Sequence, residues 1–283
     1  MTDREERRRE AGVVELGRAI EAITLDFGNT LVAFPSASMG GVLSDTAERA
    51  AATWGFASDQ FERVWGEERL RQLSEEVPQG REANMDVRAA RVLARLRGHA
   101  VPPGQERWDD AEVASWSSPD EVEAVLDDYA SAFVRLTPVP PEIGPLLEML
   151  AARYPVAILS NWPLAAAVER FLEVAGWSAH LSAVVISQRV GVIKPRPEIF
   201  RAAAGALHVA SGPRLLHVGD DLGADVAGAH GVGWRAAWVR VKPEDSPLPV
   251  AESSGGERPD LVVDRVTDLP GALGLRARRG PQP

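Results

Sequence analysis

The sequence predicts an α/β fold: a doubly wound parallel sheet with an inserted all-helical domain. After Pro138, short apolar runs alternate with amphipathic segments, which is the pattern of parallel strands joined by helices. A similar apolar run at residues 22–27 is closed by the turn signal Gly28-Asn29 and indicates a first strand of the same sheet. The roughly 100 residues that follow contain no convincing strand, so a helical block is inserted after the first strand.

The expected elements follow in chain order. Ser44-Asp45 and Ser58-Asp59 open two helices of the insertion, and a third lies near residues 85–96. Ser118-Pro119-Asp120-Glu121 combines an N-cap serine, a proline at the first helical position and the glutamate of a capping box. The later strands are expected at 156–159, 183–186, 215–218, 236–241 and 261–263. We assign 19–36 and 137–275 to the core, 37–136 to the insertion, and 1–18 and 276–283 to disordered tails.

The composition narrows the classes of function. The 283 residues include no cysteine, which excludes disulfides, zinc–thiolate centres and cysteine nucleophiles and suits a reducing compartment. A net charge of −10 disfavours binding to a nucleic-acid backbone. No apolar run approaches the about 20 residues of a membrane span, and no signal-peptide pattern is visible. We therefore expect a cytoplasmic protein without a membrane or nucleic-acid partner, while its oligomeric state is left open.

Two residue types have a distribution that bears on function. Of the 31 basic residues only two are lysine, Lys194 and Lys242, so a lysine here suggests a place where the planar guanidinium of arginine does not fit. The five histidines show no metal-ligand spacing, and we expect His217 and His230 to be structural.

Side chains that can take part in catalysis or ligand binding follow several of the predicted strands. They are Asp26, the pair Ser160-Asn161, Lys194, and the acids Asp220, Asp221 and Asp225. Ligands of a doubly wound sheet bind beyond the carboxyl ends of its strands, so these side chains converge there. Three carboxylates together need a cation, and an all-oxygen set suits Mg²⁺, which usually also takes a substrate phosphate oxygen. A lysine beside the cation would neutralise the remaining phosphate charge, and an aspartate can attack phosphorus to form an aspartyl-phosphate.

As a set, these segments resemble the haloacid dehalogenase superfamily of hydrolases. The matching segments are Leu25-Asp26-Phe27-Gly28-Asn29-Thr30-Leu31, Leu159-Ser160-Asn161, Gly191-Val192-Ile193-Lys194-Pro195 and His217-Val218-Gly219-Asp220-Asp221-Leu222-Gly223-Ala224-Asp225-Val226. The resemblance covers about residues 20–34 and 138–275. It implies a Rossmann-like core, a type 1 helical cap and a phosphatase that acts on a small phosphorylated substrate.

The resemblance also implies roles for single residues. Asp26 is the nucleophile and a Mg²⁺ ligand, together with Asp220 and the carbonyl of Gly28, while Asp225 acts through water or by orienting the site. Ser160 and Lys194 take part in catalysis and, with Asn161, hold the phosphoryl group. Thr30, Trp162 and Asp221 are candidates for the wall of the pocket.

Gly28 departs from the pattern of most phosphatases in the family, which carry a second aspartate at this position. That residue is a general acid and base, a contribution typically worth about 10²–10⁴-fold. We infer either a good leaving group, such as an anomeric sugar phosphate or an acyl phosphate, or an acid from the cap. The cap candidates are Glu48, Glu67, Glu68 and His99. Three alternatives stay open. One is a metal-independent dehalogenase that uses Asp26 on carbon. The others are a degenerate, non-catalytic protein that binds a phosphorylated ligand or a partner, and an enzyme that transfers a phosphoryl group between two positions on a sugar, for which the second aspartate is lacking at Gly28.

Overall fold

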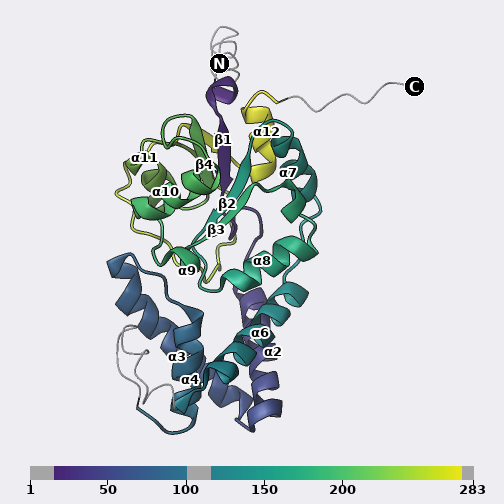
Figure 1. Cartoon of the computed structure of the whole chain (residues 1–283), viewed down its shortest axis with the longest axis vertical. Coiled ribbons are helices and arrows are strands. Elements are labelled where there is room, and N and C mark those ends of the chain that lie inside the picture. Colours follow the sequence, from purple (N-terminus) through teal and green to yellow (C-terminus); the bar gives the residue numbers. More distant parts are fainter. Residues whose placement is uncertain (1–15, 101–115, 276–283) are drawn as a thin grey trace, which may run out of the picture.

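The computed structural model describes residues 16–100 and 116–275, and a six-stranded sheet forms its centre (Figure 1). The strands are β1 (Ala22–Leu25), β2 (Val156–Ser160), β3 (Ala183–Ile186), β4 (Leu215–Gly219), β5 (Arg235–Val239) and β6 (Leu261–Val263). They lie in the order β3-β2-β1-β4-β5-β6, and all neighbours are parallel. The order reverses direction between β1 and β4, which is where sheets of this kind bind their ligands.

Helices cover both faces of the sheet. Every residue of β1, β2 and β4 is buried, which explains why these strands read as unbroken apolar runs. Successive side chains of β1 enter two separate clusters, Ala22 on one face and Ile23 on the other. The Ile23 face is covered by α7 (Ile143–Ala151), α8 (Ala165–Val174) and α12 (Leu269–Ala272), and the Ala22 face by α10 (Pro197–Ala206) and α11 (Gly228–Gly231). Shorter elements are α9 (Ser187–Val190), a π-helical segment (Leu222–Ala227) and 3₁₀ turns at Val77–Gln79, Ser178–His180 and Val266–Asp268.

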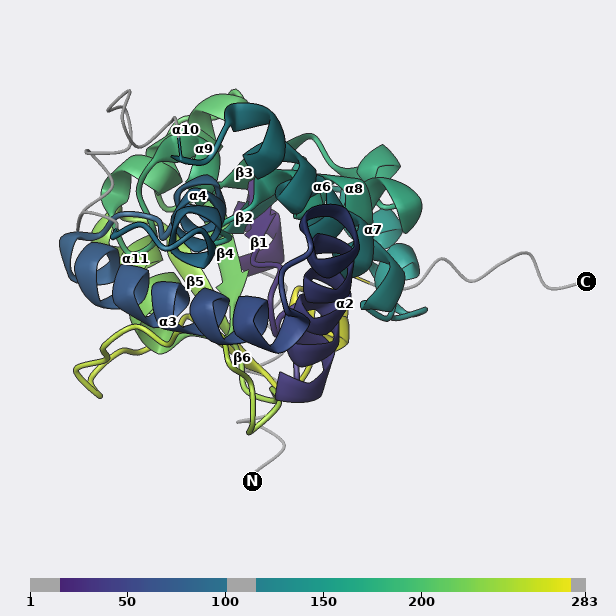
Figure 2. The same ribbon diagram turned by 90° about the horizontal axis from the view of Figure 1, so that it is seen from below.

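Four helices of the described residues lie between β1 and α7 and form the cap. They are α2 (Ser36–Trp54), α3 (Ser58–Glu76), α4 (Met85–Leu96) and α6 (Pro119–Leu136). The predicted capping box is present at the start of α6, where Ser118 Oγ accepts from the N–H of Glu121 and the Glu121 carboxylate accepts from the N–H of Ser118. α2 begins earlier than the expected Ser44. Figure 2, which views the molecule from the cap side, shows the cap helices in front of the sheet strands.

The predicted fold class is confirmed: a parallel α/β sheet with a helical insertion after its first strand. The residue boundaries of core and cap remain our proposed division. Residues 16–19 are helical, so 16–18 differ from the disordered tail expected there, and Tyr154 Oη donates to the carbonyl of Gly17 at 2.7 Å. The rest of both expected tails lies outside the described residues. Among the described helices, none has the length and apolar character needed to cross a bilayer.

Candidate active site

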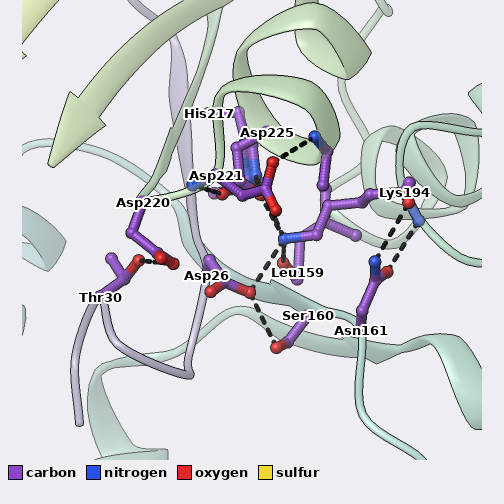
Figure 3. A network of polar contacts seen from close by, with 12 residues as sticks. Asp26, Thr30, Leu159, Ser160, Asn161, Lys194, His217, Asp220, Asp221 and Asp225 are labelled. Carbon is purple, nitrogen blue, oxygen red and sulfur yellow. Dashed lines mark hydrogen bonds and ion pairs between the residues drawn. The ribbon is translucent and has the colours of Figure 1, made fainter. Parts of the chain in front are cut away.

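Asp26 lies directly beyond β1, at the switch point of the sheet. Its backbone N–H donates to the carbonyl of Val218 on β4 at 2.8 Å. Its Oδ1 accepts hydrogen bonds from Ser160 Oγ at 2.8 Å and from Lys194 Nζ at 2.9 Å (Figure 3). The ends of β1 and β2 and the loop after α9, which are far apart in sequence, thus bring these side chains together.

Lys194 is buried at the centre of this network. Besides Asp26, its ammonium donates to Asp225 Oδ1 at 2.6 Å and to the carbonyl of Leu159 at 2.9 Å. These three acceptors match the three N–H bonds of an ammonium group. Burial disfavours the charge, but Asp225 and Asp26 outweigh it and raise the pKa of Lys194 above its usual range. Lys194 is therefore a fixed positive charge between two aspartates.

Asp26, Asp220 and Asp225 form a cluster that could hold a metal ion, because one carboxylate oxygen from each lies within 4.8 Å of the others. Burial raises the pKa of Asp26, and Asp225 raises it further, although Lys194 opposes both. Burial, with Asp26 and Asp225, raises the pKa of Asp220 to about 7. Burial is the largest cause of both shifts, so a further cation at the cluster would favour the ionised carboxylates. An all-oxygen, carboxylate-rich site fits Mg²⁺.

Asp225 behaves differently from the other two acids. Burial opposes its charge, yet Lys194 and His217 prevail and lower its pKa. His217 Nε2 lies 3.0 Å from Asp225 Oδ1, and Asp225 Oδ2 accepts from the backbone N–H of Asp221 at 2.9 Å. A side chain at Gly219 would place its Cβ 2.1 Å from Asp225 Oδ2, so only glycine allows this approach. Both Asp225 oxygens are thus bound within the protein, which suits orientation of the site better than direct metal binding.

His217 belongs to this network, although the sequence predicted only a structural role for it. The imidazole is fully buried on β4, and its Nδ1 lies 2.8 Å from Thr24 Oγ1 on β1. Burial, followed by the charge of Lys194, lowers the pKa of His217. A neutral ring that donates from Nε2 to Asp225 and accepts at Nδ1 from Thr24 satisfies both contacts. His230, also expected to be structural, pairs with Asp260 at 3.0 Å.

The remaining predicted residues take more local positions. Asn161 Oδ1 accepts from the N–H of Lys194 at 2.7 Å and its Nδ2 donates to the Lys194 carbonyl at 3.1 Å, so its amide holds the lysine-bearing loop. Asp221 caps the π-helical segment by accepting from the N–H groups of Gly223 and Ala224. Thr30 Oγ1 donates to Asp220 Oδ1 at a long 3.4 Å.

An apolar wall fills the space beside Gly28. A Cβ at this glycine would lie 2.7 Å from Leu248 Cδ1 and 3.2 Å from Trp162 Cζ3. Trp162 is 3% exposed and packs edge-on against Phe27, with ring centroids 5.6 Å apart, so it is a core residue more than a lining of open space. The aspartate that most phosphatases of the family carry at this position would fit only if Leu248 moved aside.

Leu248 belongs to a segment that we call the strap, residues 242–252, which crosses the site after β5. Ser246 Oγ accepts from Asn29 Nδ2 at 2.9 Å, and the carbonyl of Pro247 accepts from Arg69 of α3 at 2.6 Å. The N–H of Ala251 donates to Asp221 Oδ2 at 2.7 Å. The strap therefore contacts the turn after β1, the cap and the turn after β4. The sequence did not reveal it because its residues show no periodic pattern.

The site is closed in this structure. Asp26, Lys194 and Asp220 are at most 8% exposed. A cavity of about 670 Å³ lies where α4 and α6 face α8 and α9, and it is lined by residues such as Leu126, Leu164 and Arg170, not by the aspartate cluster. A substrate therefore needs movement of the cap or strap to reach Asp26.

None of the proposed cap acids makes a described contact with the site residues. Glu67 and Glu68 pair with Arg95, and Glu68 lies 2.8 Å from it. His99 stacks on Trp116 with ring centroids 4.7 Å apart, and Glu48 is exposed. The described contacts thus place none of these four residues as an acid beside Asp26 in the closed state.

Three known proteins resemble this chain in sequence or in fold. A phosphoserine phosphatase from Thermus thermophilus is 45% identical over 73 residues, which are 25% of this chain and 29% of that protein. A 5-amino-6-(5-phospho-D-ribitylamino)uracil phosphatase from Escherichia coli is 29% identical over 254 residues, 90% of this chain and 96% of that protein. The crystal structure of a 2-haloacid dehalogenase from Pseudomonas syringae shares the fold with a TM-score of 0.61 at 21% identity, covering 90% of this chain and 98% of the other.

The family model of haloacid dehalogenase-like hydrolases matches residues 20–233, a span that contains the cap, Asp26, Lys194 and the acids after β4. This match confirms the family expected from the sequence motifs and, with it, that the protein is an enzyme of the hydrolase class. The chain belongs to the haloacid dehalogenase-like hydrolases.

Proposed function

We propose that this protein is a Mg²⁺-dependent phosphatase that acts on a small metabolite through an aspartyl-phosphate at Asp26. The observation that carries the proposal is the placement of Asp26 between an ammonium group and a cation site. Lys194 Nζ lies 2.9 Å from Asp26 Oδ1, and carboxylate oxygens of Asp26, Asp220 and Asp225 lie within 4.8 Å of one another. Two relatives named as phosphatases support the same reaction class. Bound Mg²⁺ would polarise the phosphoryl oxygens and offset the charge of the carboxylates.

Asp26 performs the covalent step. Its Oδ1 is held by Ser160 and Lys194, whereas no described residue donates to Oδ2, which makes Oδ2 the attacking oxygen. The carboxylate forms a bond to phosphorus, and the bond from phosphorus to the leaving oxygen breaks with its electron pair on that oxygen. Water then attacks phosphorus, Asp26 leaves as a carboxylate, and the two protons of that water go to the phosphate and to solvent.

The neighbouring residues divide the supporting work. Asp26, Asp220 and the carbonyl of Gly28 would hold the metal, and Asp225 orients Lys194. Ser160, Lys194 and the backbone N–H of Asn161 would hold the phosphoryl oxygens. Because Gly28 supplies no acid, we propose a substrate whose leaving group departs without a proton, such as an anomeric sugar phosphate or an acyl phosphate. A cytoplasmic location remains a prediction.

A panel of phosphate esters that includes aryl and acyl phosphates, assayed with Mg²⁺, tests the proposal. We expect phosphate release that Asp26→Asn lowers by at least about 10³-fold, the scale of losing a nucleophile. Borohydride reduction during turnover should convert residue 26 to homoserine, which mass spectrometry detects. Asp264→Asn is the matched control, because Asp264 pairs with Arg240 at the surface and should leave activity unchanged. No phosphate release from any member would refute the proposal.

The dehalogenase alternative is separated by metal dependence. The apolar wall of Leu248 and Trp162 beside Gly28 would also suit an alkyl group, so this second candidate has a structural basis. A phosphatase loses its activity in EDTA, whereas a dehalogenase releases halide from 2-haloacids with or without EDTA. Ligand binding without turnover of either substrate class would favour the non-catalytic alternative.

A further inference from the structure

Lys242 is the second of only two lysines among 31 basic residues, and it too contacts an aspartate of the site. Its Nζ lies 2.8 Å from Asp220 Oδ2. Lys194 holds the other two acids of the cluster, Asp26 and Asp225. The two compact ammonium groups of this arginine-rich chain therefore share the three carboxylates between them.

The two lysines differ in how firmly they are held. The Lys194 side chain is 2% exposed and its donors are used by three acceptors. The Lys242 side chain is 30% exposed and contacts a single carboxylate. Its backbone directly follows Val241, whose N–H donates to the carbonyl of Asp264 at 3.0 Å. The ammonium can therefore leave Asp220 while its backbone stays in place.

The backbone of Asp220 is held in place, while its carboxylate can exchange one cation for another. The indole N–H of Trp238 donates to its backbone carbonyl at 3.0 Å. Among the described residues, its Oδ1 accepts only from Thr30, at 3.4 Å, and its Oδ2 accepts from Lys242 at 2.8 Å. A divalent cation at the cluster would attract the same carboxylate that the ammonium neutralises, so the two cations compete.

We propose that Lys242 is an exchangeable cation: it neutralises Asp220 before metal binds, and metal binding displaces it toward the phosphoryl group of the substrate. The inference rests on the Mg²⁺ site of the proposed function. Displacement leaves an ammonium at the start of the strap beside the cluster, where the phosphate dianion of a bound substrate would be a new anion. Lys242 is thus a positioning residue before metal binds and a phosphate-binding residue afterwards.

Calorimetric titrations of the full chain with Mg²⁺ alone, and with inorganic phosphate at saturating Mg²⁺, test this exchange. Lys242→Met removes the charge and keeps the length of the side chain. We expect it to bind Mg²⁺ about tenfold tighter and phosphate about tenfold weaker, the scale of a coupling between neighbouring charges. Lys242→Arg keeps the charge and should return both affinities toward those of the parent. A purely structural role would not change the two affinities in opposite directions.

Arg240→Met is the matched control, since Arg240 also follows β5 but pairs with Asp264 at the surface. It removes one positive charge without touching Asp220 and should change either affinity by less than about twofold. Lys242→Gln replaces the methionine variant if that variant has a lower thermal midpoint. Unchanged or weaker Mg²⁺ binding, or unchanged phosphate binding, overturns the exchange while leaving the phosphatase proposal intact. A parent protein that does not bind Mg²⁺ overturns both.

Discussion

Substitution of Gly28 tests the packing that distinguishes this site from those of most phosphatases in its family. A new Cβ would lie 2.7 Å from Leu248 Cδ1 and 3.2 Å from Trp162 Cζ3, both below the usual carbon–carbon separation of about 3.5–4.0 Å. Trp162 is enclosed by aromatic rings and cannot yield, whereas half-buried Leu248 can. Gly28 is not among the described residues with positive φ, so the cost comes from these contacts alone.

We expect Gly28→Ala to lower the free energy of unfolding by about 1–3 kcal/mol, the usual range for overpacking. Leu248→Ala removes the nearer contact, so Gly28→Ala should cost at least about 1 kcal/mol less in that background. Gly66→Ala is the control, because no atom lies within 4 Å of a Cβ added at this position of α3. It should stabilise by about 0.5–1 kcal/mol, since alanine is the better helix former. Urea unfolding at pH 7 measures each value.

The same packing governs acid catalysis. An aspartate at position 28 can reach the leaving group only if Leu248 makes room. We therefore expect Gly28→Asp to keep a steep dependence of rate on leaving-group pKa, and Gly28→Asp with Leu248→Ala to flatten it, with up to about 10²-fold gain on an alkyl phosphate. Free energies of Gly28→Ala and Leu248→Ala that add within about 0.3 kcal/mol would refute the packing argument. So would a flat dependence in the parent enzyme.

Two further predictions concern the buried charges. Lys194→Met leaves Asp26 and Asp225 without their shared cation and should destabilise the protein by about 3–5 kcal/mol at pH 7. The loss of stability should be smaller at pH 5, where the carboxyls take up protons. Urea unfolding at both pH values measures the two losses, and equal losses would contradict this reasoning. The pKa of Asp220 is raised to about 7, so its contribution to stability is present below its unfolded pKa and is lost as the pH rises through 7. Because Mg²⁺ binds the ionised form, the gain in thermal midpoint on adding Mg²⁺ should grow between pH 6 and pH 8, and a gain independent of pH would exclude this coupling.

The convergence of Asp26, Ser160, Lys194 and Asp220 could be predicted because it follows from topology. Parallel strands bring their carboxyl ends to one edge, and these residues come at or after strand ends. The partners of each carboxylate could not be predicted, because they depend on distances of a few ångströms between segments far apart in sequence. Asn161 illustrates this limit: its amide binds the backbone of Lys194 and is not available to phosphate.

His217, Lys242 and Leu248 show which information the sequence lacked. His217 lies inside an apolar strand, and only the register of β4 against β1 places it opposite Thr24. The scarcity of lysine indicated a special role for Lys194. The same argument applied to Lys242, which contacts Asp220 in the structure. No sequence feature predicted the position of Leu248, because it lies in an aperiodic loop and is placed by the contacts of the strap.

The partners of the three carboxylates indicate different roles for Asp225 and for the other two acids. Asp225 has both oxygens bound by groups that do not leave, namely Lys194, His217 and the backbone of Asp221, and its pKa is lowered. Asp26 and Asp220 have raised pKa values, so a further cation would stabilise their ionised forms. Opposite pKa shifts among adjacent carboxylates separate their roles. Under the proposed function, Asp225 would orient the site, and Asp26 and Asp220 would exchange partners when metal and phosphate bind.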